Sequence, residues 1–262
     1  MEIEVLDYDR KANRLAVLIT GSDSAMLNAI RRLAMEEVPV LAIEDVEIRK
    51  NSSVLYDEMV ALRLGLVPLK TELDDYTLPE ECKCNGAGCA RCQAKLSLSS
   101  AEAAYVYSDE LKSKDPKVKP VHGKMPIVKL LKGQKIEVEA TAMLGRGKQH
   151  AKWSPGLVYY KHYPQIKVTG DIKDPELVEK YPTIFSAKAG KVSVDERALA
   201  KSHISDSIEE LTGGAVKVEE KENDFVLFVE SWGQLECREI LRQAMAIYEE
   251  KLEQLQKELG KK

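Results

Sequence analysis

The chain has 262 residues, of which 44% are hydrophobic and 31% are charged, and its formal net charge is −4. This composition can bury the core of one large domain or of several small ones, and so many charges exclude a membrane-embedded protein. Because acidic residues slightly outnumber basic ones, the chain has no overall positive charge that would attract it to nucleic acid. The N-terminal residues lack the basic and apolar regions of a secretion signal, so we expect a cytoplasmic protein.

The first predicted elements are a β-hairpin and a helix. Apolar residues cluster at 3–6 and at 15–19 around a polar turn at 9–13, which is a hairpin pattern. Ser and Asp at 22–24 are candidate N-caps, because their side chains accept hydrogen bonds from the unpaired amides of a first helical turn. The helix should end at Pro39, where strand-like sequence begins.

The middle of the chain is predicted to be largely β-structure. A short helix within residues 56–69 should break at Gly65. Three later segments are rich in apolar and β-branched residues and are predicted strands: 96–107, 136–143 and 153–160. The charged connection at 112–124 contains proline and should be an exposed loop, and Pro164 should end the last of these strands.

Proline and glycine become frequent between residues 166 and 216, so we predict a small separate αβ module there. Its predicted elements are a helix that begins at Pro175 and ends at Lys180, a hairpin at 184–194 that includes Gly190, and a helix at 195–211. Residues 217–229 then have the composition of a strand pair that turns at 221–224, and a final helix follows.

The final predicted helix carries a narrow apolar stripe. Its members alternate at spacings of four and three residues: Leu241, Met245, Tyr248, Leu252, Leu255 and Leu259. Such a seam packs along a partner helix, although an amphipathic helix lying on its own domain gives the same pattern. We favour a partner, because the seam runs to the end of the chain and the small N-terminal hairpin can hardly cover it.

Four of the five cysteines are clustered, in the pattern C-x-C-x4-C-x2-C: Cys82, Cys84, Cys89 and Cys92. Without a secretion signal, such a cluster indicates metal ligands rather than disulfides. Four thiolates can close a tetrahedral shell, and Gly86 and Gly88 permit the tight turns this requires. The site should therefore be structural, with Zn²⁺ favoured over an iron–sulfur cluster or redox thiols. The remaining Cys237 is expected to be a buried packing residue.

No pattern in the chain predicts catalysis. The histidines are scattered and none has the spacing of a helical metal pair: His122, His150, His162 and His203. Residues 145–150 are glycine-rich and basic but lack the phosphate-loop pattern, so they should form an exposed turn that makes protein contacts. Nothing resembles the acidic Mg²⁺ triad that a polymerase active site needs.

Three segments carry a resemblance to a known family. Residues 27–33 (LNAIRRL) match an Asn-Ala-Leu-Arg-Arg signature, residues 59–69 contain RLGLVPL, and residues 150–155 read HAKWSP. In these segments the chain resembles the alpha-type assembly subunits of multisubunit RNA polymerases, most closely the D-type subunit of the archaeal enzymes. The archaeal and eukaryotic forms are favoured, because the bacterial form lacks the cysteine loop. The loop here is one residue longer between its second and third cysteines than in the eukaryotic relatives, which also carry zinc.

The resemblance implies an α+β fold in which a discontinuous alpha-type dimerisation domain, 1–45 and 216–262, encloses two inserts. These would be a β-rich insert domain with the zinc loop, 46–165, and a small ferredoxin-like insert, 166–215. It implies a non-catalytic scaffold that pairs with subunit L, is joined by the small subunits N and P, and nucleates assembly of the large catalytic subunits. Nucleic acid would be met only through the assembled polymerase.

The resemblance also assigns roles to two helices. The dimer interface would comprise Met26, Ile30, Leu33, Leu241, Met245, Tyr248, Leu252 and Leu255. Asn28, Arg31 and Arg32 would contact the second-largest subunit, whereas by themselves paired arginines on a helix indicate a solvated face. Many archaeal relatives hold iron–sulfur clusters in the ferredoxin-like insert. This insert has no cysteine, so we expect no cluster in it.

Two other functions compete with the scaffold. A stand-alone redox or electron-transfer protein could use the cysteine loop, and it would be a coloured, stable monomer. A zinc-dependent hydrolase is disfavoured, because no general base lies near the cysteines in the sequence.

Overall fold

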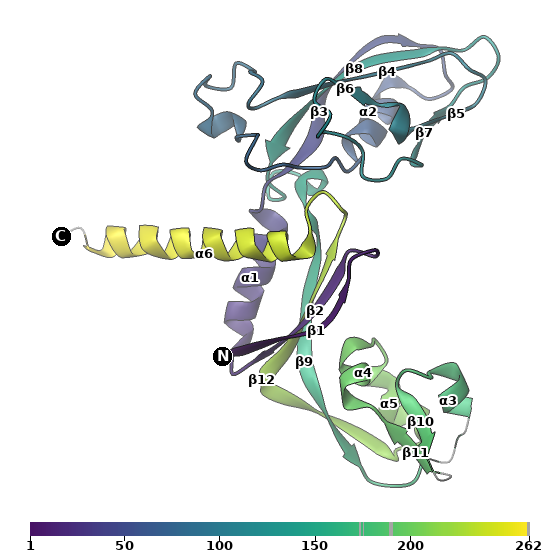
Figure 1. Cartoon of the computed structure of the whole chain (residues 1–262), viewed down its shortest axis with the longest axis vertical. Helices are drawn as coiled ribbons and strands as arrows, with labels where there is room; N and C mark the ends of the chain where they lie inside the picture. Colours follow the sequence, from purple (N-terminus) through teal and green to yellow (C-terminus); the bar gives the residue numbers. More distant parts are fainter. Residues whose placement is uncertain (173, 175, 189–190, 261–262) are drawn as a thin grey trace. The chain divides into compact units, whose positions relative to one another are not determined.

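The computed structural model describes residues 1–172, 174, 176–188 and 191–260 as a mixed α+β chain (Figure 1). The chain forms two compact units, each assembled from segments that are distant in sequence. The first unit comprises Met1–Arg31 and Val158–Val229, and the second comprises Arg32–Leu157 and Glu230–Lys262. Within the described residues, no helix combines the length and the hydropathy needed to cross a membrane.

A four-stranded sheet forms the frame of the first unit. Across the sheet its strands are β1 (Glu2–Asp9), β2 (Arg14–Thr20), β12 (Val216–Ser231) and β9 (Gly156–Val168). The predicted hairpin is confirmed as β1 and β2, and the Asp9 carboxylate accepts backbone N–H groups of the turn at 2.8 and 3.0 Å. Helix α1 (Ser24–Glu36) follows, and Asp23 caps it by accepting the Met26 N–H at 2.8 Å.

Two predicted strand boundaries are wrong. Strand β9 does not end near Pro164 but continues to Val168. It lies at the edge of its sheet, where proline is tolerated because the missing N–H need not serve a ladder. Strand β12 is one continuous strand, with no turn at 221–224. The polar residues there line an exposed stretch of strand, and the Lys221 carbonyl lies 3.0 Å from Nδ1 of His162 on β9.

The remainder of the first unit is the small module between β9 and β12. Its elements are α3 (Glu176–Lys180), β10 (Phe185–Lys188), β11 (Lys191–Val194), α4 (Glu196–Lys201), the 3₁₀ turn η4 (Ser205–Ser207) and α5 (Ile208–Leu211). Phe185, Leu199 and Ile208 lie at the centre of its core. The predicted helix at 195–211 is broken, because Ser202 accepts the Ile204 N–H and ends α4. Pro175 and Gly190, named in the predicted elements, lie outside the described residues.

The second unit contains a four-stranded sheet and a smaller sheet. Across the larger sheet the strands are β3 (Val40–Asn51), β8 (Ile136–Gly145), β4 (Ala94–Ser100) and β6 (Lys112–Ser113). The smaller sheet pairs β5 (Tyr105–Tyr107) with β7 (Pro126–Lys129). Helix α2 (Asp57–Gly65) ends at Gly65 as predicted, and it buries Val60 and Leu64 in a core shared with Leu98 and Ile136.

Three segments of the second unit depart from prediction. The predicted strand at 96–107 is divided between β4 and β5, which belong to different sheets. The predicted loop at 112–124 contains β6, and its Val118 is buried. Trp153 lies in a short 3₁₀ helix, η3 (Ala151–Trp153), rather than in a strand, and its indole N–H donates to the Met143 carbonyl at 3.2 Å. The further 3₁₀ turns are η1 (Pro79–Glu81) and η2 (Ser108–Glu110).

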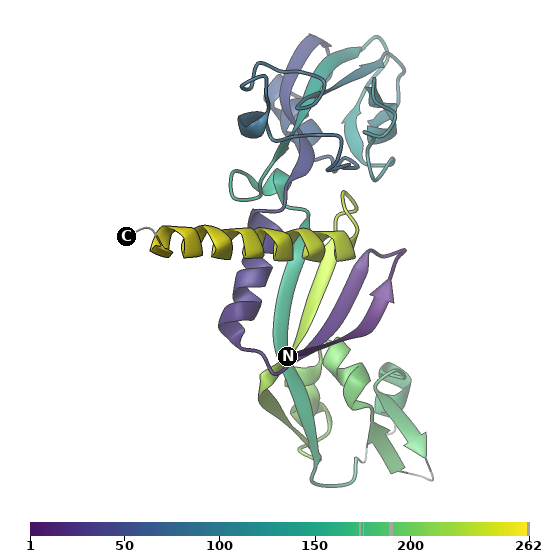
Figure 2. The same cartoon turned by 60° about the vertical axis from the view of Figure 1, so that its left-hand side comes forward.

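The chain ends in the long helix α6 (Cys237–Gly260). Its first turn is anchored in the second unit, where Cys237 is buried as predicted, and burial raises the pKa of its thiol. Residues 249–260, which form the C-terminal half of α6 in Figure 2, are all exposed. The second half of α6 therefore presents its apolar residues to solvent.

Candidate metal centre and interaction surfaces

The four clustered cysteines lie on a loop between η1 and β4. Backbone hydrogen bonds close tight turns after the first and third cysteines: Asn85 N–H to Cys82 O at 2.9 Å and Cys92 N–H to Cys89 O at 3.0 Å. Gly86 and Gly88 have φ values of +78° and +88°, a conformation that favours glycine, as the sequence suggested. These turns point the four side chains inward to one place.

The sulfur atoms are spaced as a tetrahedral metal shell requires. The closest Sγ–Sγ separations run from 3.4 Å for Cys82–Cys84 to 3.8 Å for Cys89–Cys92, and all four sulfurs lie within 4.8 Å of one another. A metal–sulfur distance of about 2.3 Å in a tetrahedron places sulfurs about 3.8 Å apart. No cysteine is in a disulfide. The four cysteines could therefore bind one metal ion, and they are the only such group among the described residues.

The environment of the loop lowers the pKa of one thiol, Cys84, and raises those of Cys82 and Cys92. Hydrogen bonds with Cys82 and Cys92 lower the pKa of Cys84 to about 6, which favours the thiolate form of this sulfur. Burial raises the pKa of Cys92 to about 12. Since the thiolate is the form that ligates metal, a bound cation would favour deprotonation of the remaining thiols.

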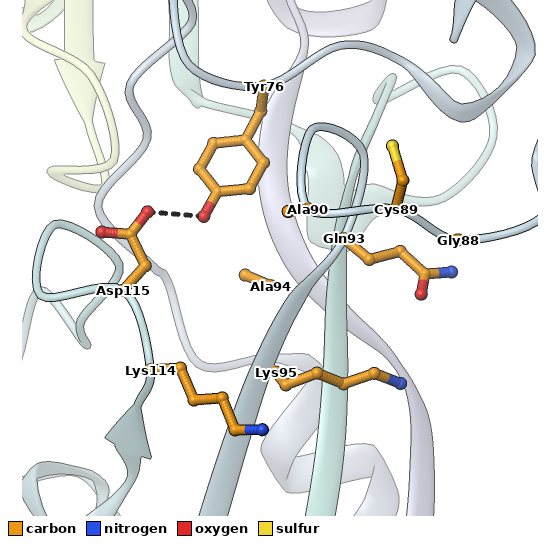
Figure 3. A pocket seen from close by; sticks show the side chains of 9 residues that line it. All are labelled: Tyr76, Gly88, Cys89, Ala90, Gln93, Ala94, Lys95, Lys114 and Asp115. Atoms are coloured by element: carbon orange, nitrogen blue, oxygen red, sulfur yellow. Dashed lines mark hydrogen bonds between the residues drawn. The ribbon is translucent and has the colours of Figure 1, made fainter. Parts of the chain in front are cut away.

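A hollow of about 410 Å³ adjoins the cysteine loop (Figure 3). On one side the Tyr76 hydroxyl donates to the Asp115 carboxylate at 2.7 Å, while Gln93 and Lys95 extend on the other. Burial raises the pKa of Tyr76, and the Tyr76 hydroxyl lowers the pKa of Asp115. The Asp115 carboxylate that lines the hollow is thus stabilised in its ionised form by its hydrogen bond with Tyr76.

The polar residues singled out on α1 lie on its surface. Arg31 donates to the Asn28 side-chain oxygen through Nε at 3.1 Å and Nη2 at 2.9 Å. Arg32 is exposed and forms an ion pair with Glu36 at 3.3 Å. Of the apolar residues assigned to this helix, Ile30 and Leu33 are only 6% and 9% exposed, and Met26 is half-buried. Ile30 and Leu33 therefore already belong to the core of the chain.

The apolar stripe on α6 is exposed along most of its length. Leu241 and Tyr248 are half-buried, whereas Met245, Leu252 and Leu255 are 40%, 49% and 55% exposed. Leu259 is more exposed still. The stripe is therefore partly covered at Leu241 and Tyr248 and largely exposed from Leu252 to Leu259.

One exposed apolar surface was not predicted. Tyr56, Met59, Leu62 and Leu66, on and beside α2, expose between 44% and 79% of their surface. Val60 and Leu64 of the same helix are buried. The sequence did contain a sign of this surface. Apolar residues occur all round this short helix, whereas a helix that is covered on one face needs them on that face only.

Three of the histidines have local contacts in the structure. His150 accepts the Lys152 N–H through Nδ1 at 3.1 Å, His162 packs on Phe225, and His203 lies beside Tyr159. Each of these three therefore has a local packing or hydrogen-bonding role.

Comparison with known proteins adds a full-length likeness. Residues 46–156 match the family model described as the RNA polymerase Rpb3/RpoA insert domain. The chain is 35% identical to DNA-directed RNA polymerase subunit Rpo3 of Methanosphaera stadtmanae, over 97% of each chain. It is also 35% identical to the Rpo3 subunit of Pyrococcus furiosus, over 99% of this chain and 98% of that one. The Rpo3 subunit of Archaeoglobus fulgidus is 34% identical, over 98% and 97%.

Proposed function

The chain belongs to the Rpo3 subunits of archaeal DNA-directed RNA polymerase, the D-type members of the Rpb3/RpoA family, and we propose that it is the non-catalytic assembly scaffold of this enzyme. It is thus a subunit of the transcribing nucleotidyltransferase. The observation that carries the scaffold role is the exposed apolar stripe of α6, because a soluble protein rarely leaves such a surface without a partner.

The first proposed partner is subunit L. Met245, Leu252 and Leu255 would enter the interface directly, with Met26, Leu241 and Tyr248 at its margins. Ile30 and Leu33, also assigned to this interface, are buried within the chain itself. An obligate interface of this kind buries more than about 2,000 Å² and has a largely apolar centre. The heterodimer, joined by subunits N and P, would then nucleate assembly of the large subunits.

The second-largest subunit would be recruited by the polar surface of α1. Asn28 holds Arg31 in a fixed orientation through two hydrogen bonds, and Arg32 stays exposed. A guanidinium oriented in this way is suited to bidentate contact with a carboxylate of a partner. In this proposal nucleic acid is met only through the assembled polymerase.

The proposed division of labour follows the four parts of the chain. Residues 1–45 and 216–262 would form the dimerisation domain, 46–165 the insert domain with the metal loop, and 166–215 a ferredoxin-like insert. Since the last part has no cysteine, and thiolates hold iron–sulfur clusters, we propose that it is kept for its shape.

The metal of the cysteine loop is proposed to be Zn²⁺. Four thiolates with tetrahedral spacing and no open position suit a structural zinc site. Bound zinc supplies cross-links that order a segment with few apolar residues. Cys82, Cys84, Cys89 and Cys92 would hold it, and the turns at Gly86 and Gly88 let them converge.

A pull-down from a native extract tests the scaffold role, with the tagged full-length chain as bait. We expect subunit L and the large polymerase subunits to co-purify. The competing redox function predicts a coloured monomer with a reversible iron–sulfur cluster. A colourless chain recovered with polymerase subunits supports the scaffold, whereas a well-behaved monomer that recovers none of them refutes it.

A further inference from the structure

The glycine-rich segment after β8 forms a turn with residues 148–150 exposed, as expected from its sequence, but its backbone also packs closely against the end of α1. The Lys148 N–H donates to the Glu36 carbonyl at 2.9 Å. At Gly147 an added Cβ would overlap the Met35 carbonyl oxygen, so only glycine allows this approach. The segment is therefore fixed by its backbone, and Arg146 lies next to that anchor.

Arg146 contacts the residues that lead into the metal loop. Its Nη1 lies 2.7 Å from Glu80 Oε1, and its Nη2 lies 2.9 Å from Glu81 Oε1. Both glutamates belong to η1, whose last residue immediately precedes Cys82. Arg146 is about one-third exposed, at 32% for its side chain. One guanidinium thus neutralises two adjacent carboxylates that would otherwise repel each other beside the first metal ligand.

The same arginine also approaches the part of the chain that joins α1 to β3. Its Nε lies 4.0 Å from Glu37 Oε2, and the other oxygen of Glu37 lies 3.3 Å from Lys251 Nζ on α6. Glu37 is only 19% exposed, so solvent screens this carboxylate less than a surface one. A continuous series of charges therefore runs from the cysteine loop to the helix that carries the apolar stripe.

From these contacts we infer that Arg146 is a positioning residue for the metal loop and, through Glu37, couples the occupancy of that loop to α6. The inference rests on the proposed metal centre. When metal draws Cys82 and Cys84 into one shell, η1 is held where both of its glutamates reach Arg146. Without metal, η1 would be less ordered and Arg146 would lose its contacts with Glu80 and Glu81. The Glu37 carboxylate, and with it the ion pair to Lys251, would then be held less firmly.

An isolated ion pair on the surface contributes little to stability. Arg146 differs from such a pair because it is shared by two glutamates and because the backbone beside it is fixed. Removal of Arg146 leaves Glu80 and Glu81 without their counter-ion at the point where the ligand loop begins. Replacing groups that orient metal ligands commonly costs about 10–100-fold in metal affinity. Because Arg146 acts through η1 and touches no ligand, the low end of that range applies.

The experiment compares zinc release from the zinc-loaded full-length chain and its variants, using a chromogenic chelator in excess. R146A should release zinc about tenfold faster than the wild type. R146K keeps the positive charge but lacks the planar guanidinium that reaches two carboxylates, so its release rate should be intermediate. K148A is the matched control, because it removes one positive charge from the same segment and keeps the backbone bond to Glu36. Its release rate should equal that of the wild type.

Amide hydrogen exchange then tests the coupling to α6. Removing zinc from the wild type should raise exchange in residues around Lys251, and E37Q should abolish this response while zinc release stays within about twofold of wild type. Equal release from R146A and K148A, or an α6 response that persists in E37Q, overturns the inference. If the wild-type chain takes up no zinc, both the proposed zinc centre and this inference fail. If it takes up zinc but the variants behave as just described, only the inference fails.

Discussion

The Tyr76 hydroxyl donates a hydrogen bond of 2.7 Å to the Asp115 carboxylate, joining two segments that are distant in sequence on one side of the hollow beside the cysteine loop. The bond lowers the pKa of Asp115. Burial raises the pKa of Tyr76, to which the same bond contributes. Both shifts mean that the pair is most stabilising when Asp115 is ionised and Tyr76 is protonated.

The first prediction concerns this pair. Y76F should lower the free energy of unfolding by about 1 kcal/mol at neutral pH, because it keeps the ring and removes the hydrogen bond. A lowered folded-state pKa of Asp115 gives stability that is complete above its unfolded value of about 3.9 and is lost as pH falls through the folded value. The difference between wild type and Y76F should therefore shrink in acid. Urea unfolding of Y76F, D115A and the double variant measures the coupling, and additive effects would show that the bond contributes nothing.

The second prediction concerns metal content. The purified chain should contain about one zinc per molecule, coordinated by four thiolates. C89S/C92S should lose the zinc and loosen residues 82–92, while the sheet of the first unit stays folded. C237A serves as the control, since Cys237 is buried at the start of α6 and should leave metal content unchanged. Elemental analysis and amide exchange provide the measurements. Iron and sulfide with visible absorption would contradict zinc.

The third prediction concerns the apolar stripe. L252E/L255E should weaken binding to subunit L by at least about 100-fold, because two charges would be buried without partners in an apolar interface. The isolated chain should lose no more than about 0.5 kcal/mol, since both side chains are largely exposed in it. Q254E/K257Q changes the charge by the same −2 on other faces of α6 and is the matched control. Size-exclusion chromatography of the co-expressed pair distinguishes the two variants, and equal pairing would argue against the seam.

The fourth prediction separates pairing from recruitment. R31A/R32A should pair normally with subunit L, since the arginines lie off the apolar stripe, yet fail to recruit the second-largest subunit. R10A/K11A removes the same charge from the exposed hairpin turn and should assemble fully. Reconstitution from purified subunits, followed by native mass measurement, reads out both steps. Loss of the pair with subunit L in R31A/R32A would instead place these residues in the dimer interface.

Much of this protein was already determined by its sequence. The spacing of Cys82, Cys84, Cys89 and Cys92 predicted a convergent ligand set, because so short a loop with glycine turns has few ways to arrange four thiols. The three matching segments predicted the family for a similar reason. Each is a local string of residues, and local strings can be compared without knowing the fold. The hairpin, the cap at Asp23 and the break at Gly65 were likewise readable, because neighbouring residues decide them.

The tertiary structure decided what depends on residues distant in sequence. Pro164 continues a strand because β9 is at a sheet edge, and 221–224 remain extended because β9 pairs beside them. The helical pattern marked Ile30 and Leu252 alike as apolar, yet one is buried and the other exposed, since burial depends on what packs above each residue. Arg146 finds Glu80 and Glu81 only when the chain has folded. Periodicity records which side chains are apolar or charged, and only three-dimensional packing assigns their partners.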